Sequence, residues 1–136
     1  MSQDLPLVGE SLAPLVKTVT QAGIDAYASA SGDYNPIHVD PQFAAQTAFK
    51  GTIAHGLTAL GYIGQAMTRR FGRAWLESGR VEMKFRAPIR PGDTVTVAGR
   101  VVAHQAGGAT LLEIVCENQQ GTAVVTAQAS VRLPNP

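Results

Sequence analysis

Charged residues and cysteines are scarce in this chain. Asp, Glu, Lys and Arg make up 15% of the sequence, and 11 basic residues nearly balance 10 acidic ones. No run of Lys or Arg stands out, so nucleic acid is not an expected partner. The single cysteine, Cys116, cannot form an intrachain disulfide and lies in an apolar stretch, where a buried, unreactive thiol is expected. A low density of charge leaves more of the surface apolar, which favours an oligomer.

Segments that direct a protein into or across a membrane are also lacking. No apolar run approaches the ~18 residues that a membrane span requires. Residues Met1 to Glu10 have neither the basic region nor the apolar region of a secretory signal. We therefore expect a cytoplasmic protein that has no membrane partner.

The sequence shows no motif for a cofactor. The three histidines, His38, His55 and His104, are spread along the chain, so no group of residues has metal-ligand spacing. No phosphate-binding glycine motif follows a predicted strand. We expect neither a metal ion nor another cofactor.

The chain changes character at its middle. Its length of 136 residues suits one domain, and no repeat or linker divides residues 1–136. Residues 1 to about 72 have the patterns of helices and loops, whereas the remainder alternates like strands. This segregation is typical of an α+β domain.

The first half is predicted to contain short elements followed by one long helix. The expected order is a strand at Leu15–Thr20, a helix from the Thr20 cap to about Ser29, a loop at Ser31–Val39, a short helix starting at Asp40-Pro41, and a long helix from His55 to about Phe71. Apolar and small residues surround the long helix, which is typical of a buried one. Gly61 and Gly64 each weaken a helix by about 1 kcal/mol relative to Ala. We therefore expect a wrapped sheet to pack close against it.

The second half is predicted to form an antiparallel sheet. The expected strands are Val81–Arg86, Thr94–Ala103, Thr110–Glu117 and Ala123–Leu133. In the last of these, apolar residues from Val125 to Leu133 alternate with polar ones. Such alternation gives a sheet with one apolar face, and the long helix is the natural cover for it.

The chemically informative segment is Ser31-Gly-Asp-Tyr-Asn-Pro-Ile-His38. Asp33 and His38 lie on either side of the Asn35-Pro36 turn, which can bring both within reach of one small molecule. A carboxylate and an imidazole that share a water can act as an acid–base pair. The same residues are also ordinary turn formers, because Asp and Asn often bond their own backbone. From the residues alone, a purely structural turn is the favoured interpretation.

This segment resembles the signature of the MaoC-like dehydratases, also called (R)-specific enoyl-CoA hydratases. Further matching motifs occur in the same order, namely Ala54-His-Gly56, Phe85-x-x-Pro88 and Pro91-Gly-Asp93. The resemblance covers nearly the whole chain and implies a hotdog fold, in which an antiparallel sheet wraps one long helix. It also implies reversible hydration of trans-2-enoyl thioesters, carried by coenzyme A or a carrier protein, to (R)-3-hydroxyacyl thioesters.

The resemblance assigns catalytic roles to three residues. The family's catalytic Asp and His fall on Asp33 and His38, and its oxyanion-binding glycine falls on Gly56. Water attack at C3 moves negative charge onto the thioester oxygen. The start of the long helix is suited to stabilise that charge, because its backbone N–H groups are unpaired and its dipole is positive there.

Three further residues are expected to bind substrate. Asn35 is expected to hold the loop more than to touch substrate, and Tyr34 is a candidate for the wall of the acyl pocket. Gly61 stands where some relatives have a serine, which removes a polar contact and opens space. His55, beside the oxyanion donor, is interpreted as a structural residue.

Two other functions stay open at this stage. A hotdog acyl-CoA thioesterase would share the fold and the thioester site, although such enzymes usually lack the Asp and His spacing found here. A non-catalytic subunit of a heteromeric dehydratase would bind acyl chains, but the intact Asp33, His38 and Gly56 argue against it. A small sheet around one helix also leaves edges exposed, so we expect a homodimer or a higher homo-oligomer.

Overall fold

The computed structural model describes residues 5–134. Met1–Asp4 and the last two residues of the predicted 1–136 domain lie outside the described residues. The elements are β1 (Leu15–Thr18), α1 (Gln21–Ser31), α2 (Pro36–Val39), α3 (Pro41–Ala45), α4 (Gly56–Phe71), α5 (Arg73–Ser78), β2 (Arg80–Phe85), β3 (Thr94–His104), β4 (Ala109–Glu117) and β5 (Ala123–Arg132). Among these helices, none combines the length and hydropathy needed to cross a membrane.

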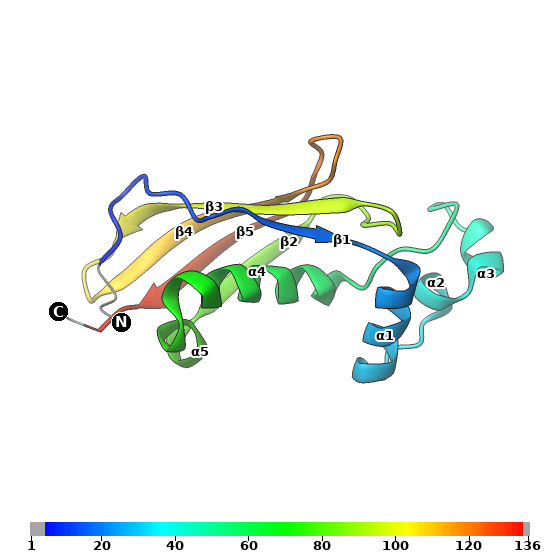
Figure 1. The fold of residues 1–136 in the computed structure, drawn as a ribbon, viewed down its shortest axis with the longest axis horizontal. Helices are drawn as coiled ribbons and strands as arrows, with labels where there is room; N and C mark the ends of the chain where they lie inside the picture. The colour runs from blue at the N-terminus through cyan, green and yellow to red at the C-terminus, as the bar shows by residue number, and fades with distance from the viewer. Residues whose placement is uncertain (1–4, 135–136) are drawn as a thin grey trace.

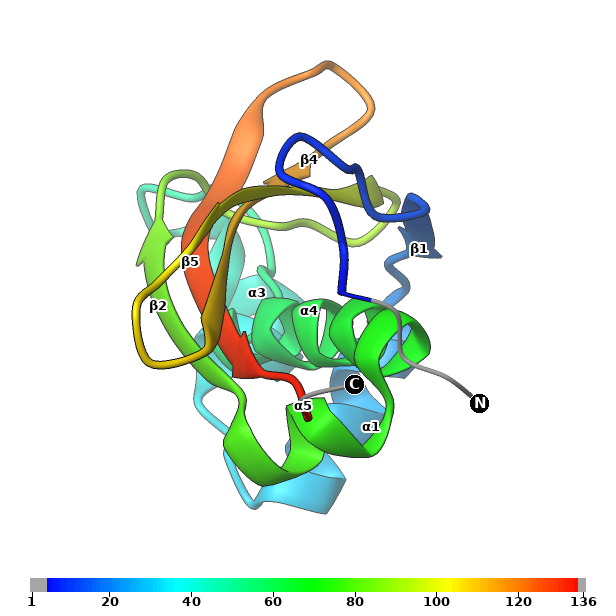
Figure 2. The same ribbon diagram turned by 90° about the vertical axis from the view of Figure 1, so that its left-hand side faces the viewer.

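One antiparallel sheet contains all five of these strands, in the order β1-β3-β4-β5-β2. The sheet curves around α4, which runs along its concave face (Figures 1 and 2). The predicted α+β class and the hotdog arrangement are thereby confirmed. The two edge strands, β1 and β2, each have one side without a partner strand in the described chain.

The core lies between the concave face of the sheet and one face of α4. The predicted alternation in β5 is confirmed, because Val125, Ala129 and Val131 are at most 3% exposed. The helix contributes buried residues at spacings of three and four, namely Ala59, Ile63, Ala66, Met67 and Phe71. This spacing places a single helical stripe against the sheet.

The other face of α4 is open, and the predicted burial of this helix on all sides is wrong. Leu57 is 56% exposed. A Cβ atom built on Gly61 would meet nothing within 4 Å, and one on Gly64 would come no closer than 3.9 Å to the Trp75 ring. One curved sheet covers only one side of a helix. The small residues on the opposite side therefore do not serve close packing within the single chain.

The helices at the other end of the molecule follow their capping residues. Thr20 begins α1 by accepting a hydrogen bond from the Gly23 N–H, as predicted. Asp40 begins α3 in the same way, by accepting from the N–H groups of Gln42 and Phe43. The helices α1, α2 and α3 gather beyond the start of α4, at the end of the molecule opposite to α5 (Figure 1).

Two short helices were not expected. The predicted loop Ser31–Val39 contains α2, because the Asn35 side chain accepts from the Ile37 N–H and Pro36 occupies a first-turn position. The second, α5, follows α4 directly at Arg73–Ser78. Both are too short for a clear hydrophobic periodicity, which explains why the sequence pattern did not reveal them.

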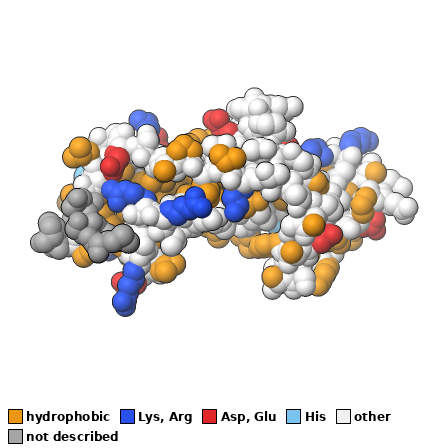
Figure 3. Space-filling model, in the orientation of Figure 1, with side chains coloured by type: hydrophobic (Ala, Val, Ile, Leu, Met, Phe, Trp, Pro, Cys, Tyr) orange, Lys and Arg blue, Asp and Glu red, His pale blue; other side chains and the backbone are white. Residues whose placement is uncertain are grey.

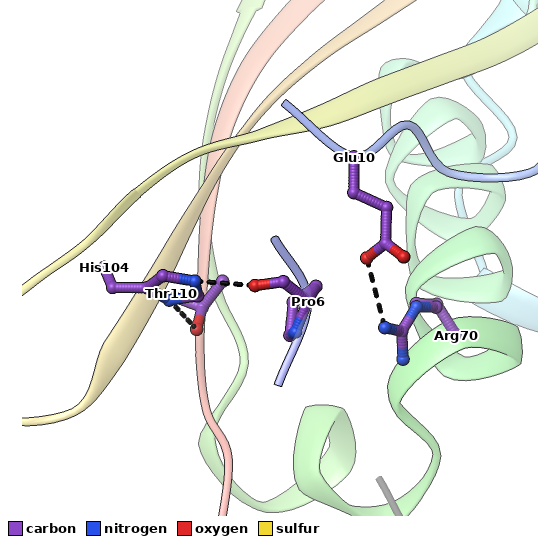
Figure 4. Close-up of polar contacts among 5 residues, drawn as sticks. All are labelled: Pro6, Glu10, Arg70, His104 and Thr110. Carbon is purple, nitrogen blue, oxygen red and sulfur yellow. Dashed lines mark hydrogen bonds and ion pairs between the residues drawn. The ribbon is translucent and has the colours of Figure 1, made fainter. Parts of the chain in front are cut away.

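The segment before β1, from Gly9 to Leu12, is hydrogen-bonded to the edge of β3. Its backbone pairs with β3, through bonds that include Leu12 N–H to the Gly99 carbonyl at 2.8 Å. At the far end of β3, His104 contacts the Pro6 carbonyl through Nε2 at 2.7 Å and the Thr110 hydroxyl through Nδ1 at 3.0 Å (Figure 4). His104 therefore ties the N-terminal segment to the sheet, at the end away from α1 and α2.

Truncation of a leucine in the concave face should destabilise the fold strongly. Leu112 is 0% exposed, whereas Leu76 in α5 is 73% exposed. We expect Leu112→Ala to lower the free energy of unfolding by about 2–5 kcal/mol, and Leu76→Ala by no more than about 0.5 kcal/mol. Denaturant unfolding measures both values, and equal losses would contradict the placement of the core.

Candidate active site

The carboxylate of Asp33 is held by its own loop. Helix α1 ends at Gly32, whose φ of 77° is a conformation that glycine adopts readily. Ser31 Oγ accepts from the Asp33 N–H, and Asp33 Oδ1 accepts from the Asn35 N–H, each at 3.2 Å. These local bonds turn the chain sharply from α1 into α2. They leave Asp33 exposed, with its second carboxylate oxygen unused by the loop.

His38 lies in α2 and is oriented by the segment that precedes α4. Its Nδ1 is 2.7 Å from the Ile53 carbonyl oxygen. Because a carbonyl oxygen only accepts, Nδ1 carries the hydrogen and a neutral His38 keeps a lone pair on Nε2. The backbone reinforces this contact, since the Ile53 N–H donates to the Ile37 carbonyl at 3.2 Å.

His55 is buried beside these two residues. It is 3% exposed, and its Nε2 donates to the backbone carbonyl of Asp33 at 2.9 Å. Its ring stacks on the His38 ring, with 3.8 Å between centroids and 24° between planes. Asp33, His38 and His55 each offer a ligand atom, and these atoms lie within 4.8 Å of one another. The sequence argument that the histidines are too spread to form a cluster is therefore wrong.

This cluster is nevertheless a poor metal site. The Nε2 of His55 is used by the Asp33 carbonyl, and its Nδ1 is buried without any hydrogen-bond partner. The stacked rings of His38 and His55 also direct their lone pairs in nearly parallel planes, whereas a shared cation needs them to converge. The arrangement suits a water held by Asp33 and His38 better than a metal ion. The expected absence of a cofactor stays a prediction.

Gly56 begins α4, at the end of that helix nearest α1 and α2 (Figure 1). The first N–H groups of a helix have no partner within it, and His55 at the cap position supplies no side-chain bond. A Cβ atom on Gly56 would lie 2.8 Å from Cζ of Phe85. The Phe85 ring therefore lies against the backbone of the predicted oxyanion donor, and any larger side chain at position 56 would displace this ring.

The three predicted substrate-binding residues have different surroundings. Asn35 caps α2, which agrees with its expected role in holding the loop. Tyr34 is 60% exposed beside Asp33. Gly61 lies on the open face of α4, five positions along the helix from Gly56. In the single chain neither Tyr34 nor Gly61 is part of an enclosed pocket.

Two residues of the site were not recognised as part of it from the sequence. His55 contacts both predicted catalytic residues, and Phe85 covers Gly56. Both belong to motifs on which the family resemblance rests, Ala54-His-Gly56 and Phe85-x-x-Pro88. Their place in these motifs was the sequence signal that could have marked them as site residues.

A groove of about 750 Å³ lies elsewhere, on the sheet. Its lining comes from β2, β3, β4 and β5 and includes Glu82, Lys84, Arg100 and Glu113. None of Asp33, His38 or Gly56 lines it. The groove is therefore separate from the candidate active site.

Comparison with known proteins shows the family of the chain. The family model described as "MaoC like domain" matches residues 6–122. An (R)-specific enoyl-CoA hydratase from Aeromonas caviae is 36% identical over 128 residues, which cover 90% of this chain and 92% of that protein. An (R)-specific enoyl-CoA hydratase from Rhodospirillum rubrum is 39% identical over 84 residues, but the match spans only 62% of this chain and 58% of that protein.

Solved structures resemble the fold over nearly its full length. The (R)-hydratase from A. caviae has a TM-score of 0.83 and 32% identity, covering 98% of this chain and 100% of that chain. The R-hydratase PhaJ1 from Pseudomonas aeruginosa has a TM-score of 0.84 and 26% identity, and the match covers 96% of this chain and 84% of that chain. The chain therefore belongs to the MaoC-like dehydratase family, and it is an enzyme of the hydratase and dehydratase class.

Two glycines of α4 should respond oppositely to alanine in the isolated subunit. There Gly61→Ala meets open space, so in the monomer it should raise the free energy of unfolding by about 0.5–1 kcal/mol through helix propensity. Gly56→Ala should lower it, because the new Cβ collides with the Phe85 ring. The double variant Gly56→Ala, Phe85→Ala should remove that collision. Thermal unfolding of the three variants is compared with that of wild type and of Phe85→Ala alone. A destabilising Gly61→Ala would show that the open face of α4 is covered in solution.

Proposed function

We propose that this chain catalyses reversible hydration of trans-2-enoyl thioesters to (R)-3-hydroxyacyl thioesters, with Asp33 and His38 as its acid–base pair. The observation that carries the proposal is the proximity of these two side chains, whose ligand atoms lie within 4.8 Å. Asp33 lies in the loop after α1 and His38 lies in α2, and both are beside the start of α4 at Gly56. The relatives named (R)-specific enoyl-CoA hydratase support the same reaction.

The geometry suggests how the residues divide the chemistry. The Asp33 carboxylate and the His38 Nε2 lone pair both accept hydrogen bonds, so together they can hold and orient one water. As the water oxygen bonds to C3 of the enoyl group, the pair takes up its proton. The electrons of the double bond move towards the thioester oxygen, and a proton delivered to C2 completes the addition.

Gly56 is the proposed donor to the thioester oxygen. Negative charge develops on that oxygen only as the reaction proceeds, so a fixed N–H at the positive end of a 16-residue helix stabilises the transition state more than the substrate. The Phe85 ring against Gly56 limits the access of water to this position from one side. Lower competition from water strengthens such a hydrogen bond.

Replacement of either proposed catalytic side chain should remove most activity. We expect Asp33→Asn and His38→Ala each to lower kcat for crotonyl-CoA by about 100-fold or more, since general acid–base groups contribute about 10²–10⁴-fold. Loss of enoyl absorbance measures the rate, and chiral analysis identifies the 3-hydroxyacyl product. Asp25→Asn and His104→Ala are matched controls, because Asp25 is exposed in α1 and His104 lies at the far end of β3.

Near wild-type turnover in either catalytic variant would show that the residue is not catalytic. The same assay with a saturated acyl-CoA and a thiol reagent examines the thioesterase alternative. Release of free coenzyme A at a rate comparable to hydration would favour that alternative over a hydratase.

We further propose that the active species is a homodimer formed through the open face of α4 and the edge strand β2. The open face carries Leu57, which is 56% exposed, and β2 carries Phe85, which is 60% exposed. Hydrophobic side chains also remain visible at the surface beside Lys and Arg side chains in Figure 3. Large apolar side chains next to an unpaired strand edge are typical of a protein interface. The carrier of the acyl chain and a cytoplasmic location stay predictions.

A charge on the proposed interface should dissociate the oligomer. We expect the purified chain to sediment as a dimer or larger, and Leu57→Glu to shift it towards monomer, because burying an unpaired carboxylate is unfavourable. Leu76→Glu is the control, since Leu76 is 73% exposed on α5 and so lies outside both α4 and β2. An active wild-type monomer at micromolar concentration would contradict the proposal, and so would dissociation by Leu76→Glu alone. A second hotdog chain found with the protein in its host would instead support a heteromeric enzyme.

A further inference from the structure

His55 contacts Asp33 and His38 and directly precedes Gly56, and we infer that it is the positioning residue that holds these three residues in register. The inference rests on the proposed roles of Asp33, His38 and Gly56. His55 is not proposed to touch the substrate, since its ring is buried and both of its nitrogens are withdrawn from solvent.

The first contact fixes the backbone of Asp33. His55 Nε2 donates to the Asp33 carbonyl oxygen at 2.9 Å, across 22 positions of sequence. This bond uses the main chain of Asp33 and leaves its carboxylate for the reaction. The local hydrogen bonds of the loop join residues 31–37 to one another. They shape the turn but do not connect it to α4. The bond from His55 ties the turn to the residue that precedes α4.

The second contact fixes the plane of the His38 ring. The two imidazoles stack at 3.8 Å between centroids, and Tyr27 lies near His55 at 4.6 Å with a tilt of 48°. The bond from His38 Nδ1 to the Ile53 carbonyl sets the direction of the ring in its plane. Stacking on His55 sets the tilt of the His38 ring. The bond to Ile53 and the stacking therefore jointly fix the direction of the His38 Nε2 lone pair.

The third contact is covalent. His55 is the cap residue of α4 and directly precedes Gly56, while its own carbonyl accepts from the Thr58 N–H at 3.0 Å. Ala54, on its other side, is anchored to the Ile89 carbonyl at 2.7 Å. These backbone bonds place the His55 side chain in a fixed position relative to the proposed oxyanion donor.

The buried and unpaired Nδ1 of His55 supports a role beyond filling space. A buried polar atom without a partner is unfavourable and rare in folded proteins. A phenylalanine would fill the same position without this atom, but it has no N–H to donate to Asp33. A glutamine would donate, but it has no ring to stack on His38. Histidine provides both contacts, at the cost of one orphaned nitrogen.

Two substitutions separate these contacts. His55→Phe keeps a flat ring and removes the donor, whereas His55→Gln keeps a donor and removes the ring. We expect each to lower kcat by about 10-fold or more, and His55→Ala by about 100-fold, since displacement of reacting groups by about 1 Å has such effects. KM should stay within about threefold, because substrate contacts are unchanged. His104→Gln is the control, as a histidine with both nitrogens bonded far from the site (Figure 4).

A double-variant comparison distinguishes positioning from an independent contribution. If the donor of His55 acts through Asp33, then His55→Phe, which removes that donor, should change the residual rate of Asp33→Asn by less than about threefold, because residues that act as a unit are non-additive. In the wild-type protein, nitrogen NMR should find neutral His55 protonated at Nε2 and neutral His38 protonated at Nδ1. This measurement needs no variant to fold.

Three results would overturn the inference. These are kcat within about threefold of wild type in folded His55→Phe and His55→Gln, an undiminished effect of His55→Phe in the Asp33→Asn background, and a His55 tautomer protonated at Nδ1. Failure of the proposed function has a different signature. The wild-type protein would then not hydrate crotonyl-CoA, or Asp33→Asn and His38→Ala would keep the wild-type rate whatever the His55 variants do.

Discussion

The packing of the concave sheet face against one stripe of α4 is the contact on which the rest of the molecule depends. It buries Ile63, Met67 and Phe71 against the strands and so fixes the axis of the helix. The first residue of α4 then has a fixed position at one end of the sheet. Docking of the loop between α1 and α2 at that end of the sheet then brings the proposed pair, Asp33 and His38, beside the N–H of Gly56.

That docking depends on few interactions. The loop between α1 and α2 is shaped by its own Asx-type bonds. The loop and α2 are docked by the contacts of His38 and His55, the bond from Ile53 to Ile37 and the bond from Gln21 to the His38 carbonyl. None of these groups contributes greatly to the hydrophobic core. Stability and catalysis are thus carried by separate sets of residues, which is common where a rigid scaffold presents a functional loop.

Elements with strong local signals were predictable from the sequence. The alternation of Val125, Ala127 and Ala129 identified the buried face of β5, and the caps at Thr20 and Asp40 identified two helix starts. The pairing of Asp33 with His38 was also accessible, because a short turn separates them and a family motif covers them. These features are encoded within about ten residues of one another, where local geometry decides the structure.

Features that depend on distant contacts were not predictable in this way. His55 lies 17 positions after His38, and only the docking of α2 against the segment before α4 stacks their rings. The open face of α4 was misjudged because an apolar or small residue has the same signature whether a sheet or another chain covers it. Helix α2 was missed because four residues are too few for a periodic pattern.

The position of Phe85 has a consequence for regulation. Its strand forms an edge of the sheet, while its ring rests on Gly56, where the thioester oxygen is proposed to bind. Any chain that pairs with this edge would alter the freedom of the ring, and thereby the environment of the donor. By thermodynamic linkage the coupling is reciprocal, so that a ligand at the donor would change the affinity of the edge for its partner by the same factor. Ligand binding at the active site and association of the subunits would then be coupled, so that each changes the equilibrium constant of the other.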